Sequence, residues 1–206
     1  MQLGVLILAA GASSRMGRPK LLLPWGDTTI LGALLRVWHS LAARQIAVVR
    51  AAGDDALAAE LERLRCPTSQ VILNPAPERG MFSSIRCAAL WTGWEPVLTH
   101  ITIVLGDQPH VRETTLRGLL DFAASRPVEI CQPARGGRGR HPIVLPVALC
   151  SRLADTRAVN LKQFRNESPE GFALWESDDA GLDLDLDEPA DYERVLKDFG
   201  PQRDSA

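Results

Sequence analysis

The sequence has little of what marks membrane-bound, disulfide-stabilised or nucleic-acid-coating proteins. Only four cysteines occur in 206 residues, with no Cys-x-x-Cys pair, so neither a zinc site nor a disulfide framework is indicated and we expect buried thiols. The 23 Lys and Arg residues nearly balance the 25 Asp and Glu residues, so a broad basic surface for nucleic acid is not expected. The first apolar run, residues 5–10, is too short to cross a membrane and lacks a basic lead-in. We expect a cytoplasmic protein with no nucleic-acid or membrane partner.

The length and composition are those of one globular domain. Hydrophobic residues make up 46% of the chain and charged residues 23%, which is ordinary usage and excludes a disordered or fibrous protein. A chain of this length suits a single α/β core. We expect one domain over residues 1–200, followed by a C-terminal tail at 201–206.

Apolar segments of strand length alternate with segments of helical periodicity. This alternation predicts an α/β fold: a single-domain, Rossmann-like, three-layer α/β/α sandwich with a mostly parallel sheet. Asp27 or Thr28 can cap the first helix, the Gly-rich residues 135–140 predict a mobile loop, and the Leu–Asp alternation at 182–187 predicts an extended strand. Strands are expected at 3–9, 46–50, 70–73, 101–105 and 128–131, and helices at 29–43, 54–64, 83–91, 113–124 and 190–199.

The loop after the first strand carries the clearest functional signal. Residues 8–20 read Leu-Ala-Ala-Gly-Ala-Ser-Ser-Arg-Met-Gly-Arg-Pro-Lys and lie at the carboxyl edge of the sheet, where α/β folds bind ligands. Gly11 and Gly17 permit positive φ and close backbone approach, while Arg15 and Lys20 add positive charge, a combination suited to a triphosphate. The loop matches neither the P-loop nor the dinucleotide-binding pattern. A Gly-Ser turn with two solvated cations is the alternative.

Carboxylates at two later positions suggest a metal site. Asp107 ends the apolar strand 101–105, with no cationic neighbour in the sequence, and is a natural ligand for a hard cation such as Mg²⁺. Asp185 and Asp187 project to one side of an extended strand, because the side-chain period of a strand is two. The alternatives are that Asp107 caps a turn before Pro109 and that the later pair is a solvated acidic face.

Two further segments contain candidate contacts. Ser84 follows the turn-rich stretch 74–80 at the predicted start of a helix, where its hydroxyl and nearby N–H groups can read the edge of a base. Helix capping by Ser83 or Ser84 is the alternative and is compatible with that role. His141 is a candidate contact to an acceptor substrate, although a lone histidine is more often structural.

These motifs together resemble the nucleotidyltransferases related to the molybdenum cofactor nucleotidylyltransferases. Residues 8–20 resemble that family's signature loop, residues 74–84 its second loop, and Gly-Asp-Gln-Pro at 106–109 its metal motif. Residues 184–192 resemble its closing segment, with Glu188 and Ala190 in place of Thr and Glu. Residues 138–142 resemble its Arg-x-Gly-His-Pro segment, with Arg140 in place of Gly. The resemblance covers residues 8–192, nearly the whole chain, and implies a fold like that of the nucleotide-diphospho-sugar transferases.

The resemblance also implies roles for individual residues. Arg15, Lys20 and Asp107 are the expected catalytic residues. Asp107 and Asp187 are the expected Mg²⁺ ligands, with Asp185 in reserve. The expected substrate-binding set is Leu8, Ala9, Ala10, Gly11, Ser13, Arg15, Lys20, Asn74, Gly80, Ser84, Asp107 and His141.

Within this family, Ala10 stands where the guanylyl branch tends to carry a second Gly. Together with Gly-Met-x-Ser-Ser at 80–84 and His-Pro at 141–142, it favours the cytidylyl branch. That branch transfers CMP from CTP to molybdopterin, releases pyrophosphate and forms the cytosine dinucleotide cofactor, which a molybdenum hydroxylase apoenzyme can receive. Guanylyl transfer to the same pterin, cytidylyl transfer to methylerythritol phosphate and sugar-1-phosphate activation are the alternatives within the enzymes. A non-catalytic carrier of the pterin cofactor is the alternative of another class.

Overall fold

The computed structural model describes residues 1–201, so residues 202–206 of the expected tail lie outside the described residues. Eight strands form one sheet in the order β10-β7-β9-β6-β1-β4-β5, with β8 paired to β7. β9 runs antiparallel to β6 and β7, β8 is antiparallel to β7, and the other pairs are parallel. The strands are β1 (Leu3–Leu8), β4 (Gln45–Ala51), β5 (Val71–Asn74), β6 (His100–Leu105), β7 (Ile130–Arg135), β8 (Arg138–Gly139), β9 (Ile143–Pro146) and β10 (Phe172–Glu176), and a separate hairpin joins β2 (Pro24–Trp25) to β3 (Thr28–Thr29).

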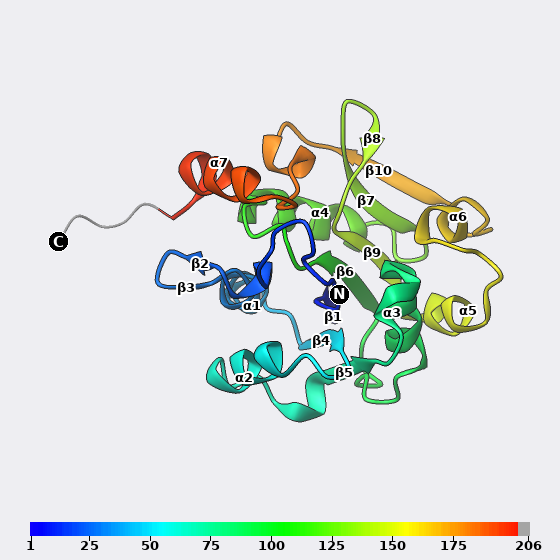
Figure 1. Ribbon diagram of the computed structural model, residues 1–206. Coiled ribbons are helices and arrows are strands. Elements are labelled where there is room, and N and C mark those ends of the chain that lie inside the picture. The colour runs from blue at the N-terminus through cyan, green and yellow to red at the C-terminus, as the bar shows by residue number, and fades with distance from the viewer. Residues whose placement is uncertain (202–206) are drawn as a thin grey trace.

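Helices cover both faces of the sheet, because its central strands are apolar on both sides (Figure 1). Val5 and Ile7 of β1 belong to one core cluster and Leu6 to the other. One layer contains α1 (Ile30–Ser40), α2 (Asp55–Arg63), α4 (Glu113–Ala124) and α7 (Pro189–Phe199), and the other contains α3 (Met81–Leu90), α5 (Cys150–Asp155) and α6 (Leu161–Asn166). This confirms the expected three-layer α/β/α fold.

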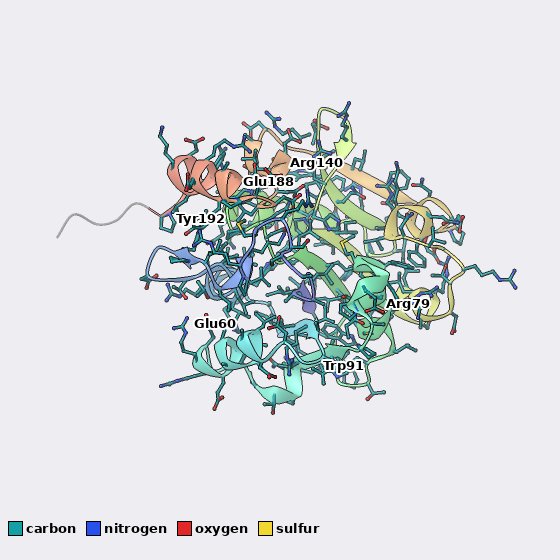
Figure 2. All side chains as sticks on the ribbon, in the orientation of Figure 1. Glu60, Arg79, Trp91, Arg140, Glu188 and Tyr192 are labelled. Carbon is teal, nitrogen blue, oxygen red and sulfur yellow. The ribbon has the colours of Figure 1, made fainter. Side chains whose placement is uncertain are left out.

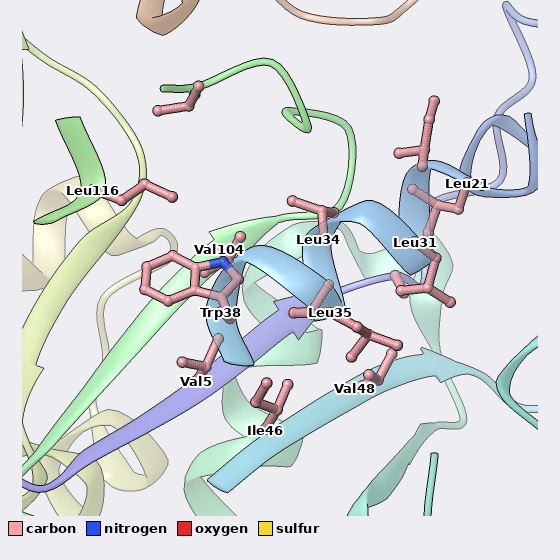
Figure 3. Packing of buried hydrophobic residues seen from close by; sticks show 14 of the residues in the cluster. Val5, Leu21, Leu31, Leu34, Leu35, Trp38, Ile46, Val48, Val104 and Leu116 are labelled. Carbon is pink, nitrogen blue, oxygen red and sulfur yellow. The ribbon is translucent and has the colours of Figure 1, made fainter. Parts of the chain in front are cut away.

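Trp38 of α1 anchors the first layer against the sheet. Its side chain is fully buried among Val5, Leu34 and Val104 in the cluster drawn in Figure 3. A large aromatic side chain in this position removes much apolar surface from water. The packing therefore fixes α1 over β1 and β6, the two strands whose ends carry the candidate site.

Several local expectations were wrong in detail. Thr29, and neither Asp27 nor Thr28, caps α1, because its Oγ1 accepts the Gly32 N–H at 3.1 Å. Residues 135–140, expected to be a loop, form the β7–β8 hairpin. All four cysteines are free, but only Cys131 is fully buried and the other three are half-buried.

The segment 182–187 is not a strand. A short 3-10 helix spans Ala180–Asp183, and the chain then runs irregularly to α7. The cause is the fully buried Asp179, whose carboxylate accepts N–H groups from Gly181 and Arg112 and the hydroxyl of Thr115. These bonds hold the chain in a turn at the start of this segment.

The carboxyl ends of β1, β4 and β6 meet at one edge of the sheet, as the parallel register requires. Leu8 lies opposite Val49 on one side and Leu105 on the other. The loops that follow these strands therefore come together. Among residues 1–201, no helix is both long and apolar enough to cross a membrane.

Candidate functional site

Hydrogen bonds within the first loop fix its conformation. Ser13 Oγ accepts the Lys20 N–H at 3.2 Å, and the Ser13 carbonyl accepts the Met16 N–H at 3.1 Å. Met16 is 3% exposed and packs into the core, which anchors the middle of the loop. Ser13 (φ 50°) and Gly17 (φ 68°) take left-handed conformations, so the loop turns tightly and delivers Lys20 back to the sheet edge.

Gly11 and Gly106 are needed for different reasons. Gly11 does not use the positive φ that the sequence analysis considered for it. A Cβ added to Gly11 would meet no atom within 4 Å. The space above its backbone is open to a ligand. A Cβ on Gly106 would lie 2.6 Å from the Leu8 carbonyl oxygen. Only glycine therefore lets the end of β6 lie against the end of β1 and place Asp107 next to the loop.

Four charged side chains form a continuous network at this edge. Lys20 Nζ donates to Asp107 Oδ2 and lies 3.7 Å from Asp187 Oδ1. Arg15 Nη2 lies 2.8 Å from Asp187 Oδ2. The Lys20 side chain is 16% exposed and that of Asp107 15%, whereas that of Arg15 is 66% exposed. The fold thus brings Arg15, Lys20, Asp107 and Asp187 together. Asp107 has no cationic neighbour in the sequence, but the fold gives it one, Lys20.

Asp185 lies beside this network. Gln108 Nε2 donates to Asp185 Oδ1 at 3.0 Å. Desolvation raises the pKa of Asp185, and the nearby Asp107 and Asp187 carboxylates raise it further. The hydrogen bond from Gln108 and the charge of Lys20 lower the pKa of Asp185 in part, so Lys20 offsets some of the repulsion among these carboxylates.

A cavity of about 430 Å³ lies between the first loop and the start of α3. Its wall contains most of the expected substrate-binding residues together with nine that were not in the expected substrate-binding set. The expected ones are Leu8, Ala9, Ala10, Gly11, Lys20, Gly80, Ser84 and Asp107, and the others are Ala12, Leu21, Ala51, Asp54, Pro77, Glu78, Met81, Leu105 and Gly106.

Asn74 fixes the second loop through hydrogen bonds to Ser83 and Ser84. It is 1% exposed, and its Nδ2 donates to Ser83 Oγ at 2.8 Å and Ser84 Oγ at 2.9 Å. α3 begins at Met81, earlier than expected, and the Ser83 hydroxyl donates to the Gly80 carbonyl at 2.7 Å. Neither serine therefore acts as the N-cap. Ser84 keeps its place in the cavity wall, held by Asn74.

His141 lies away from this cavity. It lines a second cavity of about 750 Å³ that shares Met81 with the first. Burial lowers the pKa of His141, and its Nδ1 is sealed from solvent without a partner among residues 1–201. Arg140, labelled in Figure 2, pairs with Asp183 at 2.5 Å, so the hairpin is tied to the segment before α7. The protonated imidazole is disfavoured here, and His141 is best suited to a neutral contact.

The residues that sequence reasoning missed fall into two groups. Ala51 ends β4 and Asp54 follows it, at the same edge as the first loop, so the strand order alone could have suggested them. Asp54 caps α2 by accepting the Leu57 N–H at 3.0 Å. Lys162 and Arg165 of α6 line the second cavity. No local motif marks that helix, because tertiary packing alone brings it to the site.

The donor set fits a hard divalent cation that is completed by substrate oxygens. No group of three or more His, Cys, Asp or Glu residues suitable for a metal occurs within residues 1–201. Asp107 and Asp187 nevertheless lie on either side of Lys20 Nζ. Mg²⁺ is commonly held by one or two carboxylates together with waters and phosphate oxygens. This arrangement therefore fits a cation that binds together with a nucleotide.

A mostly parallel sheet with a glycine-containing, cationic loop at its carboxyl edge defines a nucleotide-binding α/β protein. The MobA-like NTP transferase domain family matches residues 5–170, and the chain belongs to this family. It is therefore a nucleotidyltransferase.

One curated relative is a nucleotidyltransferase, and solved structures share the fold. Over 190 residues the chain is 26% identical to the molybdenum cofactor cytidylyltransferase of Escherichia coli K12, covering 91% of this chain and 92% of that protein. The crystal structure of Rv0371c from Mycobacterium tuberculosis H37Rv superposes with a TM-score of 0.76 at 30% identity, covering 95% and 97% of the two chains. A structure of Rv0371c in complex with manganese superposes with a TM-score of 0.69 at 28% identity, covering 96% and 100%.

Proposed function

We propose that this chain transfers CMP from CTP to molybdopterin, with Mg²⁺ as cofactor, and releases pyrophosphate. The observation that carries the proposal is the Lys20–Asp107–Asp187–Arg15 network, two of whose members, Lys20 and Asp107, line the cavity walled by the first loop. The similarity to a molybdenum cofactor cytidylyltransferase over 91% of the chain supports the acceptor. We also propose that the protein works in the cytoplasm and supplies a molybdenum hydroxylase apoenzyme.

The triphosphate would lie along the first loop. Backbone N–H groups of a tight loop can hold phosphate oxygens, and the open space above Gly11 lets them approach. Arg15 and Lys20 would take the charge that develops on the leaving pyrophosphate, and Ser13 keeps Lys20 in place by closing the loop. The base would lie between the Ala9–Gly11 backbone and Ser84, both of which line the cavity.

Asp107 and Asp187 would hold Mg²⁺, which when bound neutralises the phosphate oxygens that both substrates bring to the site. For that to happen, the ammonium of Lys20 must move from between the carboxylates toward the triphosphate. Its flexible four-carbon stem allows such a movement. Both carboxylates would then exchange a protein cation for the metal and remain charge-balanced.

The proposed chemistry is a single displacement. An oxygen of the terminal phosphate of molybdopterin attacks the α-phosphorus of CTP. A new P–O bond forms as the bond to the bridging oxygen breaks, and that oxygen leaves with the electron pair as part of pyrophosphate. No general base is needed, because the attacking phosphate is already ionised at neutral pH. The protein's contribution is alignment and charge neutralisation.

Pyrophosphate release with CTP, GTP or ATP in competition, each with molybdopterin and Mg²⁺, tests this function. We expect release with molybdopterin and CTP. Assays with methylerythritol phosphate or glucose 1-phosphate as the acceptor distinguish the proposed activity from those of the alternative transferases. A thermal shift with each nucleotide and Mg²⁺ measures nucleotide binding without turnover. A protein that binds molybdopterin but releases no pyrophosphate with any nucleotide would be a carrier and would contradict the proposal.

A further inference from the structure

The second cavity is a basic chamber built by the C-terminal half of the chain. The hairpin β7–β8, strand β9, helix α6 and the edge strand β10 form it, with Met81 as the shared wall toward the first cavity. Four cations and no carboxylate line it: Arg138, Arg140, Lys162 and Arg165. A concave surface with one sign of charge concentrates anions.

Only part of this charge is neutralised by the protein. Arg140 pairs with Asp183, whose pKa is lowered chiefly by its hydrogen bond to Arg140. Arg138, Lys162 and Arg165 have no ion pair with any residue in 1–201. Three cations are therefore left to attract an anionic molecule.

Of these three cations, Arg165 is the one that side-chain hydrogen bonds hold in place. Its Nη1 donates to Gln132 Oε1 at 2.5 Å, and its Nε and Nη2 donate to Asn166 Oδ1 at 3.2 and 2.9 Å. The guanidinium carbon lies 4.2 Å from the centre of the Phe172 ring, so the two planar groups can attract each other. The second N–H of each terminal nitrogen has no acceptor among residues 1–201, which leaves two donors for a ligand.

Gln132 accepts the hydrogen bond that orients the Arg165 guanidinium. It is 3% exposed in the middle of β7, and its Nε2 donates to the Arg140 carbonyl at 3.4 Å. A Cβ on Gly139 would lie 1.8 Å from Gln132 Nε2 and 3.2 Å from Arg165 Nη1. The hairpin glycine, the buried amide and the guanidinium are therefore packed as one unit.

We propose that the second cavity binds the phosphorylated acceptor, and that Arg165 is a specificity-determining residue that binds anionic oxygens of that acceptor through its two unused N–H groups. Gln132 is its positioning residue. The exposed apolar side chains of Met81 (45%), Phe172 (40%) and Leu174 (38%) on the cavity wall would contact a ring system attached to the phosphate. This inference rests on the proposed function, because it assigns the acceptor of the same transfer.

The test separates acceptor binding from nucleotide binding. Arg165→Met should raise the KM for molybdopterin about 10- to 100-fold, the effect of losing charge-assisted hydrogen bonds, while the KM for CTP stays unchanged. Arg126→Met is the matched control, because Arg126 lies 3.8 Å over the Phe122 ring and lines neither cavity. An Arg165→Met enzyme with both KM values unchanged would overturn the proposal.

A second variant keeps the test independent of folding. Gln132→Glu keeps an oxygen acceptor for Arg165 Nη1 and places a carboxylate on the guanidinium, but it removes the Nε2 donor to the Arg140 carbonyl, so thermal unfolding of the variant is measured as well. A purely structural role predicts an unchanged KM for molybdopterin and a loss of turnover that follows any loss of stability. The proposal predicts a raised KM for molybdopterin, because the guanidinium is then neutralised. Calorimetry with molybdopterin, in the presence of a non-hydrolysable CTP analogue, measures the same loss without catalysis. Parent protein that binds molybdopterin but releases no pyrophosphate contradicts only the proposed function, whereas parent protein that fails to bind it overturns this inference.

Discussion

At the residue scale, Lys20 has both an electrostatic and a structural role in the site. It is the half-buried cation that contacts both Asp107 and Asp187, and it ends the loop that Ser13 closes. A side chain that is 16% exposed and bonded to a carboxylate interacts more strongly than a surface ion pair would. The same residue therefore shapes the free site and would supply charge to the triphosphate.

Lys20→Ala should lower turnover about 100- to 1000-fold, the cost of losing one preorganised charge-stabilising donor. The fold should survive, because the first loop lies at the surface of the sheet edge. Steady-state pyrophosphate release and thermal unfolding measure the two effects. Lys197→Ala, an exposed lysine of α7, is the control and should behave like the parent. Near-normal turnover in a folded Lys20→Ala protein would remove Lys20 from the triphosphate site.

Asp107→Asn should retain the fold and lose most of the metal-dependent activity, because the negative charge is what holds a hard cation. Turnover measured across a Mg²⁺ titration checks this, with Asp121→Asn on the exposed face of α4 as the control. If Asp107→Asn shows the parent's turnover and Mg²⁺ dependence, Asp107 is not a metal ligand.

At the scale of elements, the site depends on how closely β6 and β1 end together. Gly106→Ala should cost about 1–3 kcal/mol of unfolding free energy, because its Cβ would lie 2.6 Å from a backbone oxygen that cannot move aside easily. Gly11→Ala should leave the unfolding free energy nearly unchanged, since nothing lies within 4 Å, yet weaken CTP binding by filling the ligand's space. Denaturant unfolding and nucleotide titration of both variants distinguish the two. Equal stability loss in both variants would contradict this account of the two glycines.

The C-terminal helix supports the first loop from outside. Tyr192 of α7, labelled in Figure 2, donates its hydroxyl to the Pro24 carbonyl at 2.7 Å. The Arg18 guanidinium carbon lies 5.9 Å from the centre of the same ring. This contact explains why the acidic segment before α7 reaches the loop after β1, more than 160 residues away in sequence.

Periodicity predicted the parallel strands β1, β4, β5, β6 and β7 and the longer helices, because each is a local run with its own apolar pattern. It missed the parallel edge strand β10, whose residues alternate between exposed and half-buried, and the short helices α5 and α6. It also missed the antiparallel strands β8 and β9 and the β2–β3 hairpin. The first loop and Asp107 could be placed together from strand order alone. The second cavity could not, because Gln132, Arg165 and Phe172 meet only through tertiary packing.

For the whole molecule, buried histidines set a pH limit on stability. Burial is the main cause that lowers the pKa of His100 and of His110. At His110 the hydrogen bonds to the Leu184 and Gly181 carbonyls, and then the carboxylates of Asp107 and Asp179, oppose this shift only in part. The folded protein therefore keeps both rings neutral, whereas the unfolded chain takes up protons near pH 6.5. The stability that these residues contribute is present above about pH 6.5 and is lost as the pH falls below it.

The free energy of unfolding should accordingly decrease between pH 7 and pH 5. Urea unfolding at several pH values measures this decrease. His110→Gln should reduce the slope, because Gln does not titrate, and His39→Gln, an exposed position on α1, should leave it unchanged. An unchanged slope in His110→Gln would show that this histidine does not contribute.

The nucleotide preference tests the central claim most directly. A site that hydrogen-bonds the O2, N3 and amino group of cytosine disfavours a base that leaves its buried polar atoms unpaired, by roughly 1–3 kcal/mol per group. Measure kcat/KM for CTP and for GTP, with molybdopterin as acceptor and Mg²⁺ in excess, in the parent and in Ala10→Gly. We expect the parent to prefer CTP about tenfold to several thousandfold, and Ala10→Gly to narrow that preference. A parent enzyme that prefers GTP, or that shows no preference, would contradict cytidylyl transfer.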